Sequence, residues 1–354
     1  MNPELEVARI PMNAPELIDI AQRLVGAGKG LVAMDESNGT CNKRFAALGI
    51  AQTEGERRSW RELIVTTPGL SDSISGAILY DETIRQRTKA AALFVDVLNT
   101  AGIIPGIKVD TGAKDLAGRP GEKITEGLDG LRDRLKEYAG MGARFVKWRA
   151  VITPVQGLPS RGCIEANAQA LARYAALCQE ADIVPIVEPE VLVDGDHTLE
   201  RIGEVTEETL RCLFKHLSSQ NVILEGMILK PNMVLPGLDF PKQESLEKVA
   251  AATVKCLLRT VPAAVAGIAF LSGGQSAELA SARLNAINVI AKSPTSRVPW
   301  PLVFSFARAI QQPALEIWRG KNENFDQAQD ALAHRAHCNH AALQGEYSPA
   351  MEQT

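Results

Sequence analysis

The sequence of 354 residues is short of aromatic side chains and lacks the cysteine spacings that carry metal or redox chemistry. Aromatic residues make up 5% of the chain, and its six cysteines form no C-x-x-C pair. Both a disulfide framework and a thioredoxin-like motif are therefore disfavoured, and we expect reduced thiols. No apolar run reaches the length of a membrane span, so no membrane partner is expected.

The sequence also lacks a strong net charge and a targeting segment. Its formal net charge is −4, which argues against nucleic acid or an anionic membrane surface as a partner. Residues 1–16 carry acids and prolines, without an apolar or arginine-rich targeting pattern. We expect a cytoplasmic protein; the plastid stroma stays open as an alternative, because a transit peptide could already have been removed.

What the sequence does contain is a repeated alternation of short apolar runs with helical patterns. The apolar runs cover residues 30–34, 76–80, 103–109, 144–151, 183–187, 224–230, 265–271 and 302–306. The helical patterns between and around them cover residues 17–24, 54–65, 83–100, 128–138, 164–181, 207–217, 244–258, 277–290 and 314–343. For the helix over 207–217, Thr206 is the expected N-cap.

Eight strand–helix units predict an α/β protein with a (β/α)8 TIM barrel. We expect a single domain over residues 1–354, with an N-terminal helical extension and a polar tail over about residues 344–354. An open doubly wound sheet is the alternative; it is disfavoured because no G-x-G-x-x-G follows the first run.

The sixth apolar run ends abruptly in Lys230, which Pro231 pushes toward an extended conformation. A lysine at the rim of an apolar core is desolvated, which favours the neutral, nucleophilic amine. The alternative is a lysine whose ammonium group reaches solvent from the strand end. Lys230 alone does not decide between the two.

Charged residues end most of the other runs as well. Residues at i and i+2 of a strand share a face, as in Lys147 and Arg149 or Glu188 and Glu190. If these faces point inward, the carboxyl end of the barrel gathers Asp35, Lys108, Lys147, Arg149, Glu188, Glu190 and Lys230. This is the end at which barrel enzymes hold their chemistry, and charges packed there must pair.

Two further segments suit a phosphate group. Ser272, Gly273 and Gly274 follow the seventh run and open a helix, where glycines let backbone N–H groups approach an anion. Arg308 follows the eighth run. Loops after the seventh and eighth strands form the common phosphate site of this barrel.

We expect no metal site. His334, His337 and His340 lie at i, i+3 and i+6 near Cys338, but no carboxylate completes a ligand set, so we interpret them as solvated helix histidines. His197 lies in a turn-rich loop and is interpreted as part of an Asx-type turn.

Taken together, these segments resemble the class I (Schiff-base) fructose-1,6-bisphosphate aldolases from about residue 17 to about residue 347. The resemblance rests on M-D-E-S-N-G-T at 34–40, G-I-K-V-D at 106–110, K-W-R at 147–149, P-I-V-E-P-E at 185–190, L-K-P-N-M-V at 229–234 and L-S-G-G-Q-S at 271–276. It implies reversible cleavage of fructose 1,6-bisphosphate to two triose phosphates, without a cofactor or metal, by a homotetramer.

The resemblance also implies catalytic roles. Lys230 would form the Schiff base, Lys147 and Glu188 would flank it, and Asp35 would hold a substrate hydroxyl. Glu188 would move protons during loss of water from the carbinolamine and during cleavage of the C3–C4 bond. The residues alone do not rank Lys230 above Lys108 or Lys147.

Phosphate-binding roles follow in the same way. Ser272, Gly273, Gly274 and Arg308 would bind one phosphate, and Ser37, Thr40 and Lys108 the other. Arg149 and Glu190 would be support charges. Three further residues of the matching segments have less definite roles: Lys43, Arg44 and Ser305.

The chain departs from the family pattern at Thr40, where many relatives have serine, and at Ala307, where many have glycine. It also has no tyrosine at its end, whereas many relatives use one to protonate the enamine. Tyr347 matches a mid-tail segment, so we expect water or Glu188 to supply that proton; the alternative is that Tyr347 folds back to do so.

Two alternatives remain at this point. One is an aldolase for sedoheptulose 1,7-bisphosphate, and the other is a non-catalytic scaffold that binds sugar phosphates. The intact set of Lys230, Lys147, Glu188 and Asp35 disfavours the scaffold, which has no need of a desolvated amine.

Overall fold

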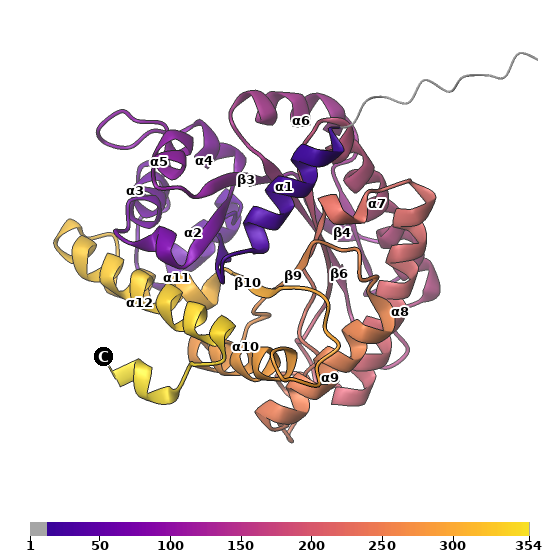
Figure 1. Cartoon of the computed structure of the whole chain (residues 1–354). Coiled ribbons are helices and arrows are strands. Elements are labelled where there is room, and N and C mark those ends of the chain that lie inside the picture. Colours follow the sequence, from indigo (N-terminus) through magenta and orange to yellow (C-terminus); the bar gives the residue numbers. More distant parts are fainter. Residues whose placement is uncertain (1–12, 354) are drawn as a thin grey trace, which may run out of the picture.

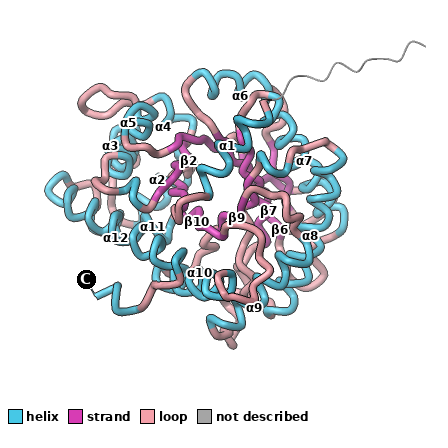
Figure 2. Tube along the Cα trace, viewed as in Figure 1, coloured by secondary structure: helices cyan, strands magenta, loops and turns pink. Residues whose placement is uncertain are grey.

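The computed structural model describes residues 13–353, and in this part of the chain eight parallel strands close into one barrel surrounded by helices (Figures 1 and 2). Around the barrel the strands follow the order β1-β10-β9-β8-β7-β6-β3-β2. Their bounds are β1 Gly30–Ala33, β2 Ile74–Leu79, β3 Ile104–Lys108, β6 Phe145–Ile152, β7 Val184–Val191, β8 Ile228–Leu229, β9 Gly267–Phe270 and β10 Leu302–Phe306. Pairing of Leu31 with Ser305 closes the barrel, so the predicted (β/α)8 fold is confirmed.

Helices cover the outside of this barrel. They are α1 Ala14–Val25, α2 Asn38–Ala47, α3 Glu54–Val65, α4 Asp81–Arg85, α5 Phe94–Thr100, α6 Leu131–Gly140, α7 Arg161–Glu180, α8 Leu199–Ser219, α9 Leu246–Thr260, α10 Ala277–Ala291, α11 Arg308–Trp318 and α12 Phe325–Gln344. Several of them begin where a hydroxyl side chain accepts a backbone N–H of the first turn, as Ser37 does for α2 and Ser276 for α10.

The amino-terminal end of the barrel is closed by α1, which lies across it in Figure 1. Leu24 and Val25 of this helix are buried against the strands, and Ser75 of β2 donates a hydrogen bond of 2.6 Å to the carbonyl of Leu24. Strand glycines make room for bulky neighbours, because a Cβ added to Gly106 would overlap the ring of Phe145. Catalytic groups are therefore confined to the other end.

Three helix boundaries differ from the sequence-based expectation. The helix expected over 83–100 is split into α4 and α5, because residues 86–93 fold back through a bridge between Arg87 and Leu93. The helix expected over 314–343 is split into α11 and α12 at Arg319, which has a left-handed φ of 49°. In both segments the chain must turn to pack against the barrel, and this requirement outweighs the local helix propensity.

The third difference concerns α8, which begins eight residues earlier than expected. Thr198 caps this helix by accepting the N–H of Arg201 at 3.2 Å, and Thr206 lies buried inside it. The prediction of Thr206 as the N-cap was wrong. Thr206 is followed by two acids, as a helix N-cap often is, although it lies inside the helix.

Three segments have structure that the sequence did not predict, and the first is helix α2. A hairpin of β4 Gly112–Asp115 and β5 Lys123–Glu126 follows β3. The expected polar tail is packed: Tyr347 is buried, and Glu352 forms an ion pair with Arg335 of α12. Over residues 13–353, no helix is long and apolar enough to cross a membrane.

The contact between Gly106 and Phe145 leads to a stability prediction. Gly106→Ala would overpack the base of the barrel, and we expect the free energy of unfolding to fall by about 1–3 kcal/mol. Gly140→Ala is the matched control, because no other atom lies within 4 Å of its added Cβ and the site is helical. Urea unfolding of both variants measures the difference; equal unfolding midpoints would contradict this packing.

Candidate active site

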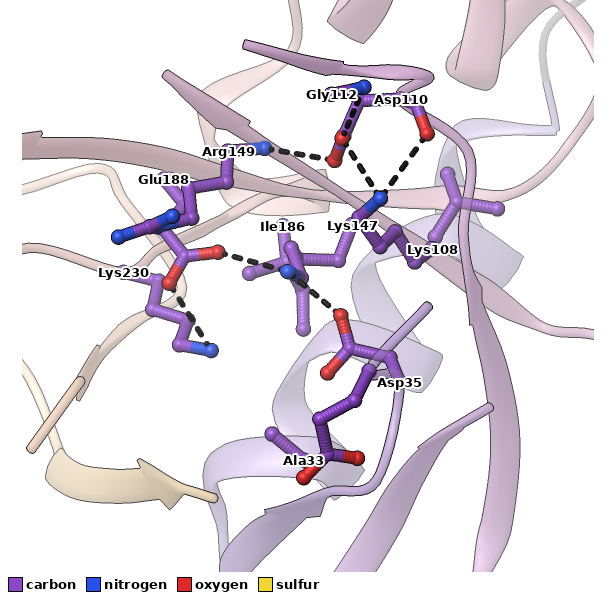
Figure 3. A network of polar contacts seen from close by, with 12 residues as sticks. Ala33, Asp35, Lys108, Asp110, Gly112, Lys147, Arg149, Ile186, Glu188 and Lys230 are labelled. Carbon is purple, nitrogen blue, oxygen red and sulfur yellow. Dashed lines mark hydrogen bonds and ion pairs between the residues drawn. The ribbon is translucent and has the colours of Figure 1, made fainter. Parts of the chain in front are cut away.

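Four buried ionisable side chains meet at the carboxyl-terminal end of the barrel (Figure 3). Lys147 lies on β6 and Glu188 on β7, whereas Asp35 and Lys230 directly follow the ends of β1 and β8. Each of the four is at most 7% exposed. The sequence prediction that the strand-end charges face one common space is thus confirmed for this set.

These side chains form a chain of contacts in which Glu188 links two amines. Lys147 Nζ lies 2.7 Å from Asp35 Oδ2 and 3.1 Å from Glu188 Oε2. The other oxygen, Glu188 Oε1, lies 3.2 Å from Lys230 Nζ. Lys147 therefore has two carboxylate partners and Lys230 has one, an asymmetry between the two amines that the sequence did not reveal.

The contacts determine which groups carry charge. Burial by itself would raise the pKa of Asp35 and of Glu188, but the neighbouring Lys147 and Lys230 hold both pKa values below the ordinary range. Burial would likewise lower the pKa of Lys147, and the two carboxylates raise it above the ordinary value. Lys147 is therefore a permanent cation between two anions.

A second layer of ion pairs surrounds this centre. Lys108 Nζ lies 2.9 Å from Asp110 Oδ1, and Asp110 also accepts the backbone N–H of Arg149 at 3.2 Å. The side chain of Arg149 pairs with Glu190. The expected pairing of opposite strand-end charges is thus present, and it holds Lys108 at the rim of the barrel.

The predicted phosphate-binding segments lie at helix starts. Gly274 and Arg308 are in contact, since a Cβ on Gly274 would lie 3.2 Å from Arg308 Nη2. Arg308 opens α11 and is exposed, so the guanidinium faces the loop of Ser272 to Gly274. At α2, the Ser37 and Thr40 hydroxyls lie 3.1 Å apart.

Comparison with known proteins decides the identity of this site. A model of the family described as fructose-bisphosphate aldolase class-I matches residues 16–354. The chain belongs to this family. It is therefore a lyase with fructose-bisphosphate aldolase activity, and its class is characterised by a lysine Schiff base.

Individual relatives cover almost the whole chain. A probable fructose-bisphosphate aldolase class 1 of Xanthomonas axonopodis pv. citri is 54% identical over 95% of this chain and 99% of its own. The cytosolic fructose-bisphosphate aldolase 4 of Arabidopsis thaliana is 52% identical over 94% of this chain and 84% of its own. Among solved structures, the Plasmodium falciparum aldolase, in complex with TRAP and a small-molecule inhibitor, has a TM-score of 0.92 at 46% identity, covering 95% and 96% of the two chains.

One side chain of this aldolase site has an unused polar atom. Ser305 lies on β10, and its buried Oγ has no hydrogen-bond partner among residues 13–353. A buried hydroxyl without a partner is costly, which leaves this oxygen available for a hydrogen bond. Of the less definite residues, Lys43 is exposed on α2, and Arg44 pairs with Glu36.

The sequence-based reasoning missed the support behind Asp35. Glu36 is flanked by Arg44 and by Arg61, whose Nη1 lies 2.8 Å from Glu36 Oε2. Gln311 of α11 donates a hydrogen bond of 2.5 Å to the carbonyl of Ala33. The second acid of the M-D-E motif was the available signal, but its partners lie in α2 and α3, and the sequence does not show that these helices turn back toward it.

The histidine interpretations are partly corrected. His337 is exposed, as expected, but His334 lies near Cys338 and near Glu352, the carboxylate that the sequence did not place there. His197 is buried, and neither ring nitrogen has a hydrogen-bond partner within the described chain. It therefore packs inside its loop, and the interpretation of the loop as an Asx-type turn stays a prediction.

The position of Lys147 between two anions predicts a pH-dependent effect on stability. Lys147 helps to keep the pKa values of Asp35 and Glu188 low, so its stabilisation is present above the ordinary carboxyl pKa, about 4, and is lost as pH falls through the lowered values. Lys147→Met should lower the free energy of unfolding by about 3–5 kcal/mol near neutral pH. Below about pH 4 the difference should shrink.

Denaturant unfolding over a pH series measures this difference. The exposed Lys255 of α9 provides the control, since Lys255→Met should change stability little at any pH. A deficit of Lys147→Met that stays constant with pH would contradict the assignment of charges.

Proposed function

We propose that Lys230 is the amine through which this aldolase forms its Schiff base with fructose 1,6-bisphosphate. The observation that carries the proposal is the asymmetry of the two buried amines: Lys147 contacts two carboxylates and Lys230 contacts one. An amine with one ion pair has fewer contacts to give up when its nitrogen bonds to a carbonyl carbon. We therefore assign the nucleophile to Lys230 and the lasting charge to Lys147.

Schiff-base formation then uses the bridge through Glu188. Glu188 first takes a proton from Lys230, and the neutral amine attacks C2 of the ketose. A second proton passes from the nitrogen to the new oxygen, and the carbinolamine hydroxyl then takes the first proton back from Glu188 and leaves as water. The product is an iminium cation at Lys230. It occupies the position of an ammonium group, so Glu188, once ionised again, faces a positive charge as before.

Cleavage uses the same groups in sequence. Glu188 accepts the proton of the C4 hydroxyl, whose electrons form the new carbonyl while the C3–C4 bond breaks and the iminium becomes an enamine. Asp35 and Lys147 lie beside this carboxylate and orient the substrate hydroxyls. Glyceraldehyde 3-phosphate leaves, the former C3 is reprotonated, and hydrolysis releases dihydroxyacetone phosphate.

We assign the reprotonation to Glu188 or to a water molecule that it binds. Tyr347 is engaged elsewhere, because its hydroxyl lies 2.7 Å from Glu352 Oε1 beside α10 and α12. Held in this way, the tail supplies no tyrosine to the barrel. Proton exchange should therefore survive removal of the residues after Gln344.

Two anion sites hold the ends of the substrate. Ser272, Gly273, Gly274 and Arg308 bind one phosphate, where two left-handed glycines and a helix start offer backbone N–H groups. Ser37, Thr40 and Lys108 bind the other. The ion pair of Arg149 with Glu190 joins β6 to β7. Ser305 offers its hydroxyl to the C2 region of the substrate.

We propose fructose 1,6-bisphosphate as the preferred substrate, because the relatives are named fructose-bisphosphate aldolases. Sedoheptulose 1,7-bisphosphate, the alternative, has one carbon more between its phosphates. The ratio of kcat/KM for the two bisphosphates tests this preference. The iminium is the electron sink, so catalysis needs no metal and activity should survive treatment with EDTA.

We also propose a cytoplasmic homotetramer. Support comes from the family and from relatives named as cytosolic or cytoplasmic. Sedimentation equilibrium of the full chain tests the tetramer.

The first test of the proposed nucleophile is covalent trapping. Incubation with dihydroxyacetone phosphate and borohydride should inactivate the enzyme and add one reduced adduct to the peptide that holds Lys230. Lys255→Met, at an exposed lysine of α9, is the matched control and should still be trapped. An adduct on another lysine, found by mass spectrometry, would overturn the assignment.

The second test concerns the phosphate site. Arg308→Ala removes a charge-assisted hydrogen bond, commonly about 1.5–3 kcal/mol, so KM for the bisphosphate should rise about 10- to 100-fold. Arg132→Ala, which removes an arginine that pairs with Glu180 on the outer surface, should leave KM unchanged. Steady-state kinetics decide, and equal KM values for both variants would assign Arg308 to a mere surface ion pair.

A further inference from the structure

Three potential metal ligands converge on the outer surface between α7 and α8, away from the catalytic set. Glu165 lies on α7, and Cys212 and His216 lie on α8. His216 Nε2 is 2.7 Å from Glu165 Oε2, and the ligand atoms of all three residues lie within 4.8 Å of one another. All three side chains are partly exposed, so an ion from solvent can reach them.

The local sequence explains this convergence. Cys212 and His216 are four residues apart, which puts both side chains on the same face of α8. Glu208 lies one turn earlier and lines the same surface groove as Cys212 and Glu165. The packing of α7 against α8 brings in the carboxylate of Glu165, so the site has no recognisable linear sequence motif.

Glu165 has a second charged neighbour on its outer side. Arg161 Nε lies 3.7 Å from Glu165 Oε1, the oxygen that faces away from the histidine contact. The other carboxylate oxygen, Glu165 Oε2, faces His216. Outer partners of this kind orient the ligands in metal sites.

We propose that Glu165, Cys212 and His216 bind a divalent cation of the zinc class. Sulfur, imidazole nitrogen and carboxylate oxygen together suit Zn²⁺ or Co²⁺, whereas Mg²⁺ and Ca²⁺ prefer oxygen ligands alone. Ligand bonds of about 2.0–2.3 Å require only small side-chain rotations from the present separations. Binding converts the Cys212 thiol to a thiolate and releases its proton to solvent.

The fourth position is open to water or to Glu208. With three protein ligands on two helices, the bound ion would crosslink α7 to α8. These helices follow β6 and β7, the strands that carry Lys147 and Glu188. The site lies outside the barrel, so the bound ion raises the thermal stability of the protein and takes no part in the aldol reaction.

A second cluster in the described chain provides the contrast. His334, Cys338 and Glu352 also lie within 4.8 Å of one another. There, however, Arg335 donates to both oxygens of Glu352, and Tyr347 donates to one of them at 2.7 Å. A dication would have to displace a buried guanidinium, so this cluster is the matched negative control.

The test is a titration of the full-length, reduced and EDTA-treated enzyme with Co²⁺. We expect a saturable thiolate-to-metal charge-transfer absorption at one equivalent, competed by Zn²⁺, together with a higher Tm in Zn²⁺. Cys212→Ser should abolish the absorption and the Tm shift, and Cys338→Ser should keep both. Aldolase activity of each variant confirms that it is folded.

Glu165→Gln and His216→Gln separate a three-ligand site from a single reactive thiol. Each should weaken Co²⁺ binding by about tenfold or more. Absence of the absorption in the wild type, or its persistence in Cys212→Ser, would overturn the site. Unchanged affinity in both Glu165→Gln and His216→Gln would assign the ion to Cys212 alone and would equally overturn it.

Discussion

The carboxylate of Glu188 is shared by two buried amines, and the arrangement of the site depends on this sharing. One oxygen contacts Lys147 and the other contacts Lys230. A carboxylate at this depth is stable only when cations surround it, and an ammonium at this depth is stable only beside carboxylates. Asp35 completes the balance by giving Lys147 a second anion. Lys230 is the amine of the network with a single carboxylate partner, and it is the member to which we assign the covalent chemistry.

The barrel supplies what this network needs. Parallel strands end together, so side chains from β6 and β7 and from the segments after β1 and β8 reach one space without long loops. At the opposite end, α1 and the ring of Phe145 fill the interior. Behind Asp35, Arg61 and Arg44 hold Glu36, so ion pairs anchor the turn after β1. Rigid surroundings of this kind keep reacting groups in place without reorganisation.

The sequence predicted the parts of this structure that depend on local periodicity and on strand ends. Eight short apolar runs indicated eight strands, and charges at their ends indicated the position of Lys147, Glu188 and Lys230. The sequence did not predict features that arise from contacts between distant segments: the fold-back of residues 86–93, the docking of Tyr347 and Glu352, and the ion pair of Arg61 with Glu36. Nor did it distinguish the two amines, because the number of carboxylate partners of each is a property of the assembled barrel.

The central claim is that Glu188 moves protons for the amine at Lys230, and the rate of Schiff-base formation tests it most directly. Glu188→Gln keeps the shape of the side chain and removes its ability to exchange a proton. Rapid-quench trapping with borohydride should show adduct formation at Lys230 slowed by about 10²–10⁴-fold, the usual contribution of general acid–base catalysis, with the affinity for dihydroxyacetone phosphate little changed. Adduct formation at the wild-type rate in Glu188→Gln would contradict the account.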